Sequence, residues 1–138
     1  MELNYIGLTA GLTAFLGIWF GHLAVRKIDF ISPSIWVPAI LAFMLGFALE
    51  AAAIYSANLY VTTSLGILGM TLLWDAIEFP RQHRRVQSGR APANPTNPRH
   101  ARILAENSSA TTIDWLKRNP TGHMLSADEL RQMGKYSA

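Results

Sequence analysis

The chain has 138 residues, of which half are apolar, a formal net charge of +3 and no cysteine. This length fits one domain with a tail, and the lack of cysteine excludes disulfides, thiolate nucleophiles and cysteine-based zinc sites. Residues 1–79 carry two basic and five acidic residues, whereas residues 80–138 carry ten basic and four acidic residues. The sequence therefore predicts an apolar first part, 1–80, and a basic tail, 81–138.

The first part contains three apolar segments, at about residues 5–25, 35–57 and 59–79. Each is long enough to cross a membrane, since about 20 apolar residues span the hydrocarbon core as a helix. The first segment is not a signal peptide by pattern, because Glu2 and no basic residue precedes it. We expect an all-α fold: a three-helix transmembrane bundle, an extended basic arm and short cytoplasmic tail helices.

The expected helix ends are marked by loop and turn residues. Residues 28–34 are predicted to form a loop, and Pro33 and Pro38 bracket the start of the second helix. The uncharged residues 56–58 predict a tight turn before the third helix. Pro80 predicts an end or a kink of that helix, because proline lacks the backbone N–H.

One face of the first helix is made of small residues. Small residues let helices approach closely in lipid, and two pairs on this face have the G-x-x-x-G spacing. Two interpretations remain open: the face packs within the chain's own bundle, or it docks onto another subunit. The face comprises Gly7, Ala10, Gly11, Ala14, Gly17, Gly21 and Ala24, and the two pairs are Gly7/Gly11 and Gly17/Gly21.

The positions of lysine and arginine predict the orientation in the membrane. Arg26 and Lys27 follow the first span, and Arg81, Arg84 and Arg85 follow the third, so both groups lie on one side. Cytoplasmic loops are enriched in basic residues. We therefore expect the N-terminus outside and the C-terminus in the cytoplasm. The arginine cluster is expected to contact anionic lipid.

The arm that follows is strongly basic and rich in proline. Residues 81–102 hold six arginines and no acid, and the stretch APANPTNP excludes a helix within it. We expect an extended conformation without a core of its own. A helix can begin near Pro98. Nucleic-acid binding is not predicted, because no aromatic residues are interleaved with the arginines.

The rest of the tail contains two capping-box spacings, T-x-x-D at 111–114 and S-x-x-E at 126–129. They predict short helices near 111–118 and 126–134. Helices of this length are unstable alone in water, so residues 100–138 are expected to contact a cytoplasmic partner. The apolar candidates for that contact are Trp115, Leu116, Met124, Leu125, Leu130 and Met133.

The end of the third span carries a series of spaced residues, LW-x3-E-x3-Q-x2-RV-x2-G-x2-P-x-NP, from Leu73 to Pro95. With the string GH-x2-V-x-K that starts at Gly21, and with Trp36 and Pro38, it resembles a family of small three-span bacterial membrane proteins of unknown function. The resemblance implies the three-span topology, a location in the bacterial cytoplasmic (inner) membrane, and no known activity. By this comparison the residues after Arg99 form a C-terminal extension.

Glu50 is an ionisable residue inside the second span. A charge at the bilayer centre costs about 3 kcal/mol or more on insertion scales, so such a residue is a functional hypothesis by default. Proton or ion transport would require a second intramembrane acid in line with it. The alternative is a structural polar contact, within the bundle or to a partner subunit. Within the bundle, a neutral Glu50 would be tolerated if it bonds to Thr9, Thr13, Thr62 or Thr63.

Three further sets of side chains carry possible chemistry. His22 lies at the inner end of the first span, where it is expected to face lipid headgroups or to pair with Asp75 or Glu78. Asp75 and Glu78 share one helix face, which suits acid–base chemistry or ion pairs with the neighbouring bases. The second and third spans contain no histidine, which disfavours a haem site within the chain. The tail histidines His83, His100 and His123 show no metal-ligand spacing.

From these observations we predict a non-catalytic accessory or scaffolding subunit of a larger membrane complex. Its partners would be other membrane subunits and anionic lipid, and it would bind no metal or cofactor by itself. The alternative is a small homo-oligomeric transporter or channel that uses Glu50. A third hypothesis is a membrane-bound enzyme that uses Asp75 and Glu78.

Overall fold

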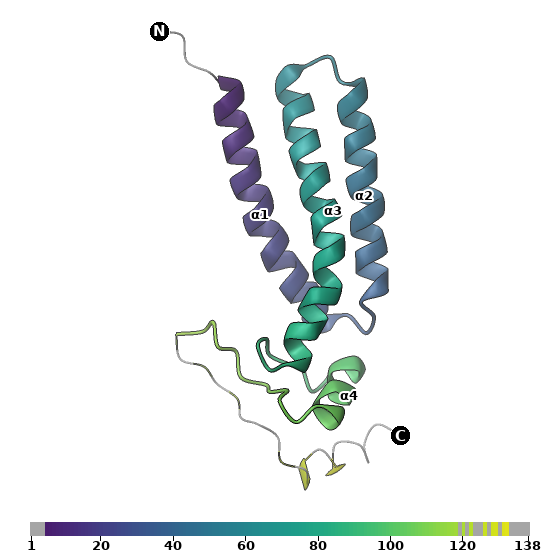
Figure 1. The fold of residues 1–138 in the computed structure, drawn as a ribbon, viewed down its shortest axis with the longest axis vertical. Coiled ribbons are helices and arrows are strands. Elements are labelled where there is room, and N and C mark those ends of the chain that lie inside the picture. The colour runs from purple at the N-terminus through teal and green to yellow at the C-terminus, as the bar shows by residue number, and fades with distance from the viewer. Residues whose placement is uncertain are drawn as a thin grey trace. The chain divides into compact units, whose positions relative to one another are not determined.

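The computed structural model describes residues 5–118, 120, 122, 126, 128, 129, 131 and 132. This part of the chain contains four α-helices: α1 (Tyr5–Ile31), α2 (Trp36–Tyr55), α3 (Leu59–Gln87) and α4 (Pro98–Glu106) (Figure 1). The first three are long and apolar enough to cross a membrane, which confirms the predicted all-α fold with three spans and indicates a multi-pass membrane protein.

Two compact units make up the structure. The bundle unit comprises Met1–Arg26 and Trp36–Phe79, and the tail unit comprises Lys27–Ile35 and Pro80–Ala138. Helices α1 and α3 therefore each contribute their apolar part to the bundle unit and their last turns to the tail unit.

In the bundle unit, α3 lies between α1 and α2 (Figure 1). Helices α2 and α3 approach closely at two glycines, where a Cβ on Gly46 would lie only 2.9 Å from the carbonyl oxygen of Gly69. The buried residues of α2 recur every seven positions, at Ala39, Gly46 and Ala53, and so form one helix face. Small side chains thus allow the two backbones to approach, as expected of membrane helices.

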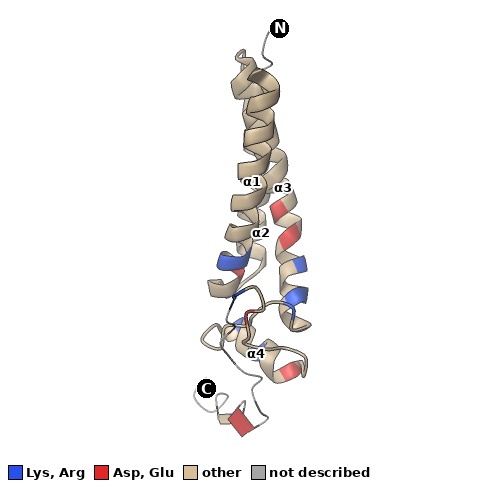
Figure 2. Cartoon of the chain, turned by 90° about the vertical axis from the view of Figure 1, so that its left-hand side faces the viewer, with Lys and Arg blue, Asp and Glu red and all other residues tan. Residues whose placement is uncertain are grey.

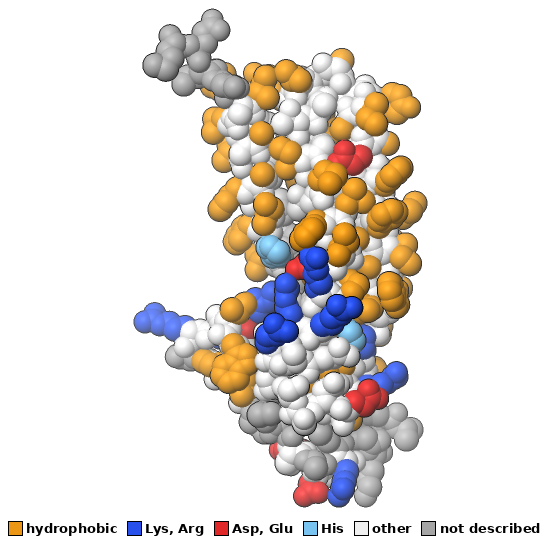
Figure 3. Space-filling view, in the orientation of Figure 1, with side chains coloured by type: hydrophobic (Ala, Val, Ile, Leu, Met, Phe, Trp, Pro, Cys, Tyr) orange, Lys and Arg blue, Asp and Glu red, His pale blue; other side chains and the backbone are white. Residues whose placement is uncertain are grey.

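The interior of the bundle unit is small and its surface is apolar. One buried cluster joins the three helices through Val25, Ala39 and Phe79. Large hydrophobic side chains are exposed along all three helices, and many of them are visible over the bundle unit in Figure 3. An apolar surface of this kind suits lipid in place of water.

Two helix ends differ from the prediction. Helix α1 continues to Ile31, whereas we expected a loop from residue 28. Helix α3 continues through Pro80 to Gln87, so Pro80 does not end it. Along α3, the acidic positions precede the basic ones (Figure 2). The expected turn before α3 is present, and Asn58 caps the helix by accepting hydrogen bonds from the N–H groups of Tyr60 and Val61, at 3.0 and 3.2 Å.

Helix α3 ends in a Schellman motif at Gly89. The N–H of Gly89 donates to the carbonyl of Val86 at 3.1 Å, and the N–H of Arg90 donates to that of Arg85 at 2.8 Å. Gly89 has a φ of 70°, a left-handed conformation that glycine adopts without steric cost. A Cβ on Gly89 would overlap the carbonyl oxygen of Ser109, so the space is closed as well.

The tail contains one predicted helix where it was expected. Helix α4 begins at Pro98, and its N-cap Asn97 accepts a hydrogen bond from the N–H of Arg99 at 3.0 Å. The predicted helix at 111–118 is wrong, because these residues form turns and bends. Of the second predicted helix, 126–134, residues 126, 128, 129, 131 and 132 are described, and the last four of these are helical. Ser126 and Glu129 form the expected reciprocal capping bonds.

The expectation that the arm lacks a core is also wrong. Residues on both sides of α4 pack with it and with the end of α3, and the N–H of Ala93 donates to the carbonyl of Thr111 at 2.8 Å. The arm is therefore part of a folded unit. The buried apolar residues of this core are Val86, Ala91, Ala93, Ile103, Leu104 and Ala110.

Candidate functional site

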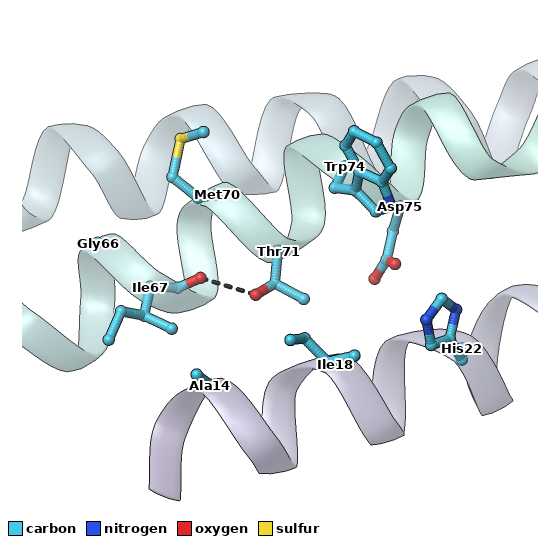
Figure 4. A pocket seen from close by; sticks show the side chains of 9 residues that line it. All are labelled: Ala14, Ile18, His22, Gly66, Ile67, Met70, Thr71, Trp74 and Asp75. Carbon is cyan, nitrogen blue, oxygen red and sulfur yellow. Dashed lines mark hydrogen bonds between the residues drawn. The ribbon is translucent and has the colours of Figure 1, made fainter. Parts of the chain in front are cut away.

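A pocket of about 510 Å³ lies between α1 and α3 in the bundle unit (Figure 4). Its walls are apolar and consist of Ala14, Ile18, Ile67, Met70 and Trp74. This volume falls within the range of small-molecule sites, which are concave and mostly apolar with a few polar groups. We call it the α1–α3 groove.

The polar groups of the α1–α3 groove gather at one end. His22 on α1 and Asp75 on α3 both line it there, and their side chains point toward one another (Figure 4). Thr71 also lines the groove, but its hydroxyl donates to the carbonyl of Ile67 at 2.8 Å. The groove therefore combines an apolar channel with one imidazole and one carboxylate.

Asp75 is held in place by a close helix approach. A Cβ on Gly21 would lie 2.5 Å from Asp75 Oδ2, so only glycine leaves room for the carboxylate here. Asp75 is 6% exposed, and its carboxylate interacts electrostatically with His22 on α1. Glu78, one turn further along α3, is also buried, at 4%. Asp75 thus faces His22, one of the partners that we expected for it.

Glu50 lies on the other side of α3, against its glycines. A Cβ on Gly69 would lie 2.7 Å from Glu50 Oε1, and one on Gly66 would lie 4.0 Å from Oε2. Glu50 Oε1 is buried without a hydrogen-bond partner among the described residues. The predicted bonds to threonine are wrong, since these hydroxyls bond elsewhere. Thr9 and Thr63 donate to the carbonyls of Tyr5 and Leu59, Thr62 to those of Ala53 and Ser56, and Thr13 bonds to Ser64.

The small-residue face of α1 is divided between two environments. Gly17 and Gly21 pack against α3, where a Cβ on Gly17 would meet Leu68 at 3.3 Å. A Cβ on Gly11 would meet nothing within 4 Å. Gly17 and Gly21 therefore pack within the chain's own bundle, as the first interpretation predicts. Gly11 is left open to a neighbouring helix.

A polar cluster that we did not predict lies in the tail unit. Asp29 is 1% exposed, and its Oδ1 accepts from Arg99 Nη2 at 2.8 Å. His100, fully buried, places Nε2 3.4 Å from Asp29 Oδ2. Because His100 Nδ1 accepts from the N–H of Asn94 at 3.0 Å, its proton sits on Nε2, toward the carboxylate. Arg99 Nη1 lies 2.8 Å from His83 Nδ1, which must accept, since arginine only donates.

The same cluster caps the end of α1. The last carbonyls of a helix have no partner within it. Asn97 Nδ2 donates to the carbonyls of Phe30 and Ser32 at 3.2 and 2.9 Å, and Arg99 Nη2 donates to that of Asp29 at 2.7 Å. Asn94 Nδ2 adds a bond to Phe30 at 3.0 Å. This capping explains why α1 extends to Ile31. We call these residues the α1 clamp: Asp29, Asn94, Asn97, Arg99 and His100.

The remaining predicted site residues lie in the tail unit. Arg81 and Arg84 are exposed, and Arg85 is partly buried with Nη1 3.3 Å from Gln82 Oε1. Trp115 is 59% exposed, and its Nε1 donates to the carbonyl of Gly89 at 3.1 Å. Within the described ranges, no group of three or more His, Asp or Glu side chains is arranged to hold a metal ion. His123 lies outside those ranges.

Residues 4–97 match a family described as a domain of unknown function, DUF4491. The chain belongs to this family. The DUF4491 match covers the bundle unit from residue 4 onward, hence the whole α1–α3 groove, as well as Asp29, Asn94 and Asn97 of the α1 clamp. It ends before Arg99 and His100. The comparisons with curated proteins and with solved structures give no match.

The sequence contained signals for part of this arrangement. The glycines of α1 and the acids of α3 were recognised, but their meeting at Gly21 and Asp75 depends on helix rotation, which spacing alone does not give. Asp29 was counted only as a charge. A signal for the clamp was present in Asn94-Pro95 and Asn97-Pro98, because paired asparagines before prolines favour caps and turns.

Proposed function

We propose that this protein is a non-catalytic accessory subunit of a larger membrane protein complex in the bacterial cytoplasmic membrane. The observation that carries the proposal is the open space at Gly11. In lipid, small residues mark the places where helices approach, and the chain's own helices leave this one uncovered. A transmembrane helix of another subunit fits there.

The charges support an orientation for the subunit. The basic residues that follow the spans include the exposed Arg81 and Arg84. Basic residues near span ends favour the cytoplasmic side, where they also attract anionic lipid. We therefore propose a cytoplasmic C-terminus and an N-terminus outside. Exposed Trp115 and Leu116, at 59% and 74%, form the part of the described tail best suited to a cytoplasmic partner.

Purification from native membranes in mild detergent tests the subunit. We expect the full chain to elute in a complex of several different chains, and Gly11→Leu to release them, because leucine would occupy the contact. Gly11 is open within the chain, so the variant should keep its helical content and membrane insertion. Gly17→Leu is the opposing control, since it collides with Leu68 and Thr71 of the chain itself. Elution of the wild type alone, or as a pure homo-oligomer, would contradict the proposal.

The second candidate is a small homo-oligomeric transporter or channel that uses Glu50. It is favoured by one observation, the buried Oε1 that lacks a hydrogen-bond partner among the described residues. Buried polar groups normally have a hydrogen-bond partner, so an ion or a proton could fill that role for Glu50 Oε1.

Glu50→Gln separates the two candidates. For the transporter we expect loss of ion or proton flux in reconstituted vesicles with unchanged assembly, since glutamine keeps the shape and removes the charge. For the accessory subunit we expect no flux from either form. A wild-type protein that shows no flux above empty vesicles excludes the second candidate.

A further inference from the structure

The α1–α3 groove has the polarity of an amphiphile in a membrane. Its polar end, at Asp75, lies four residues before Phe79, where the apolar part of α3 ends, or ~6 Å at helical rise. Its walls at Ala14, Ile67 and Met70 lie further into the spans. A molecule with its head at the membrane surface and an apolar chain toward the interior would match this order.

Asp75 determines which polar groups the ligand's head should carry. The carboxylate is nine-tenths buried, lines the groove and faces the imidazole of His22. An ionised carboxylate only accepts hydrogen bonds. An O–H or N–H group of a ligand in the groove can therefore donate to Asp75. His22, on the facing helix, supplies a further polar contact.

The walls of the α1–α3 groove favour a ligand whose polar head is a flat ring. Trp74 lines the groove beside Asp75 (Figure 4), and an indole offers a ring face for offset stacking. Met70 adds a polarizable sulfur, which contacts aromatic rings favourably. The volume of about 510 Å³ suits one ring with the first part of a chain. A phospholipid head would bring its phosphate toward the Asp75 carboxylate, and like charges repel.

We propose that the α1–α3 groove binds a lipid-soluble quinol, with a ring O–H donating to Asp75 and the apolar chain along Ile67 and Met70. The proposal concerns binding only and includes no electron transfer. The oxidised quinone has carbonyl oxygens and no O–H, so it cannot donate to the carboxylate. The groove should therefore prefer the reduced form.

Titration calorimetry on the purified full chain in mild detergent, without oxygen, tests the preference. The probes are a short-chain naphthoquinol and the corresponding naphthoquinone. We expect the quinol to bind about tenfold more tightly, as a hydrogen bond to a charged group implies. Asp75→Asn should lower quinol affinity about tenfold and remove the preference. Glu106→Gln, an exposed carboxylate at the end of α4, should change neither.

A second pair of variants tests the location. Met70→Trp fills the groove and should abolish binding, whereas Met44→Trp adds the same ring on α2, outside the groove. Met44 and Met70 are equally exposed, at 61%, so the variants are matched for burial. Circular dichroism and gel filtration verify that each variant is folded.

Three results would overturn the proposal. They are equal affinity of wild type for quinol and quinone, unchanged quinol binding by Asp75→Asn, and equal effects of the two tryptophan variants. Displacement of the quinol by phosphatidylethanolamine that itself requires Asp75 would overturn it too, in favour of a phospholipid site. These measurements use the isolated chain, so they do not depend on the existence of a partner subunit.

Discussion

Asp29→Ala is expected to lower the free energy of unfolding of the tail unit by about 3–5 kcal/mol. Removal of one partner from a buried ion pair has an effect of this size, because it leaves the other charge buried without compensation. Here the remaining groups are Arg99 and the fully buried His100. The same change loosens the capping of α1, since Arg99 also bonds the carbonyl of residue 29.

Hydrogen exchange over residues 91–111 measures this effect, because the N–H of Ala93 bonds across the tail core to Thr111. The matched control is Asp128→Ala, which removes an exposed ion pair with Arg131, 3.6 Å long with side chains 85% and 81% exposed. It should change stability by less than about 0.5 kcal/mol. Equal protection in Asp29→Ala and wild type would show that the pair does not hold the tail unit together.

Gly89→Ala is expected to destabilise the tail unit by about 3 kcal/mol. A left-handed conformation costs a residue with a Cβ about 1–2 kcal/mol, and Gly89 has a φ of 70°. The new methyl group would also displace the carbonyl of Ser109, and overpacking of this kind costs about 1–3 kcal/mol. The hydrogen bond from Trp115 to the Gly89 carbonyl should weaken with it.

The measurement is amide exchange at the end of α3, where Gly89 and Arg90 donate to the last carbonyls. Gly11→Ala serves as the control, because it adds the same methyl group in open space within a helix. That variant should be neutral or more stable by about 0.5–1 kcal/mol. If Gly89→Ala and Gly11→Ala give the same amide exchange, neither the conformation of Gly89 nor its contact with Ser109 stabilises the tail unit.

The three spans were predictable because they depend on composition and length. Lipid requires an apolar segment of about 20 residues, and any such segment is visible in a sequence. The cap at Asn58 and the start of α4 at Pro98 were predictable for a similar reason, since caps and prolines act locally. The end of α1 was not, because the groups that cap its carbonyls, among them Asn97 and Arg99, follow 64 or more residues later.

The site was only partly predictable, because its contacts join residues that are far apart in the sequence. Glu50 and Asp75 were recognised as ionisable residues in spans, but their surroundings depend on which face of α3 each one meets. A threonine contact was one of the alternatives for Glu50, whereas the helix rotation places it against Gly66 and Gly69. The tail core was missed because alanines at 91 and 93 carry little hydrophobic signal, yet they fill the space beneath α4.

The α1 clamp also constrains how the chain is threaded through the bilayer. Asp29 precedes the second span and Arg99 follows the third, and their side chains are 2.8 Å apart. Two groups in contact must lie in the same aqueous compartment. The chain between them must therefore cross the bilayer an even number of times. A nascent chain that failed to insert α2 or α3 would strand the two halves of the clamp on opposite faces, so formation of the clamp selects the correctly threaded molecule.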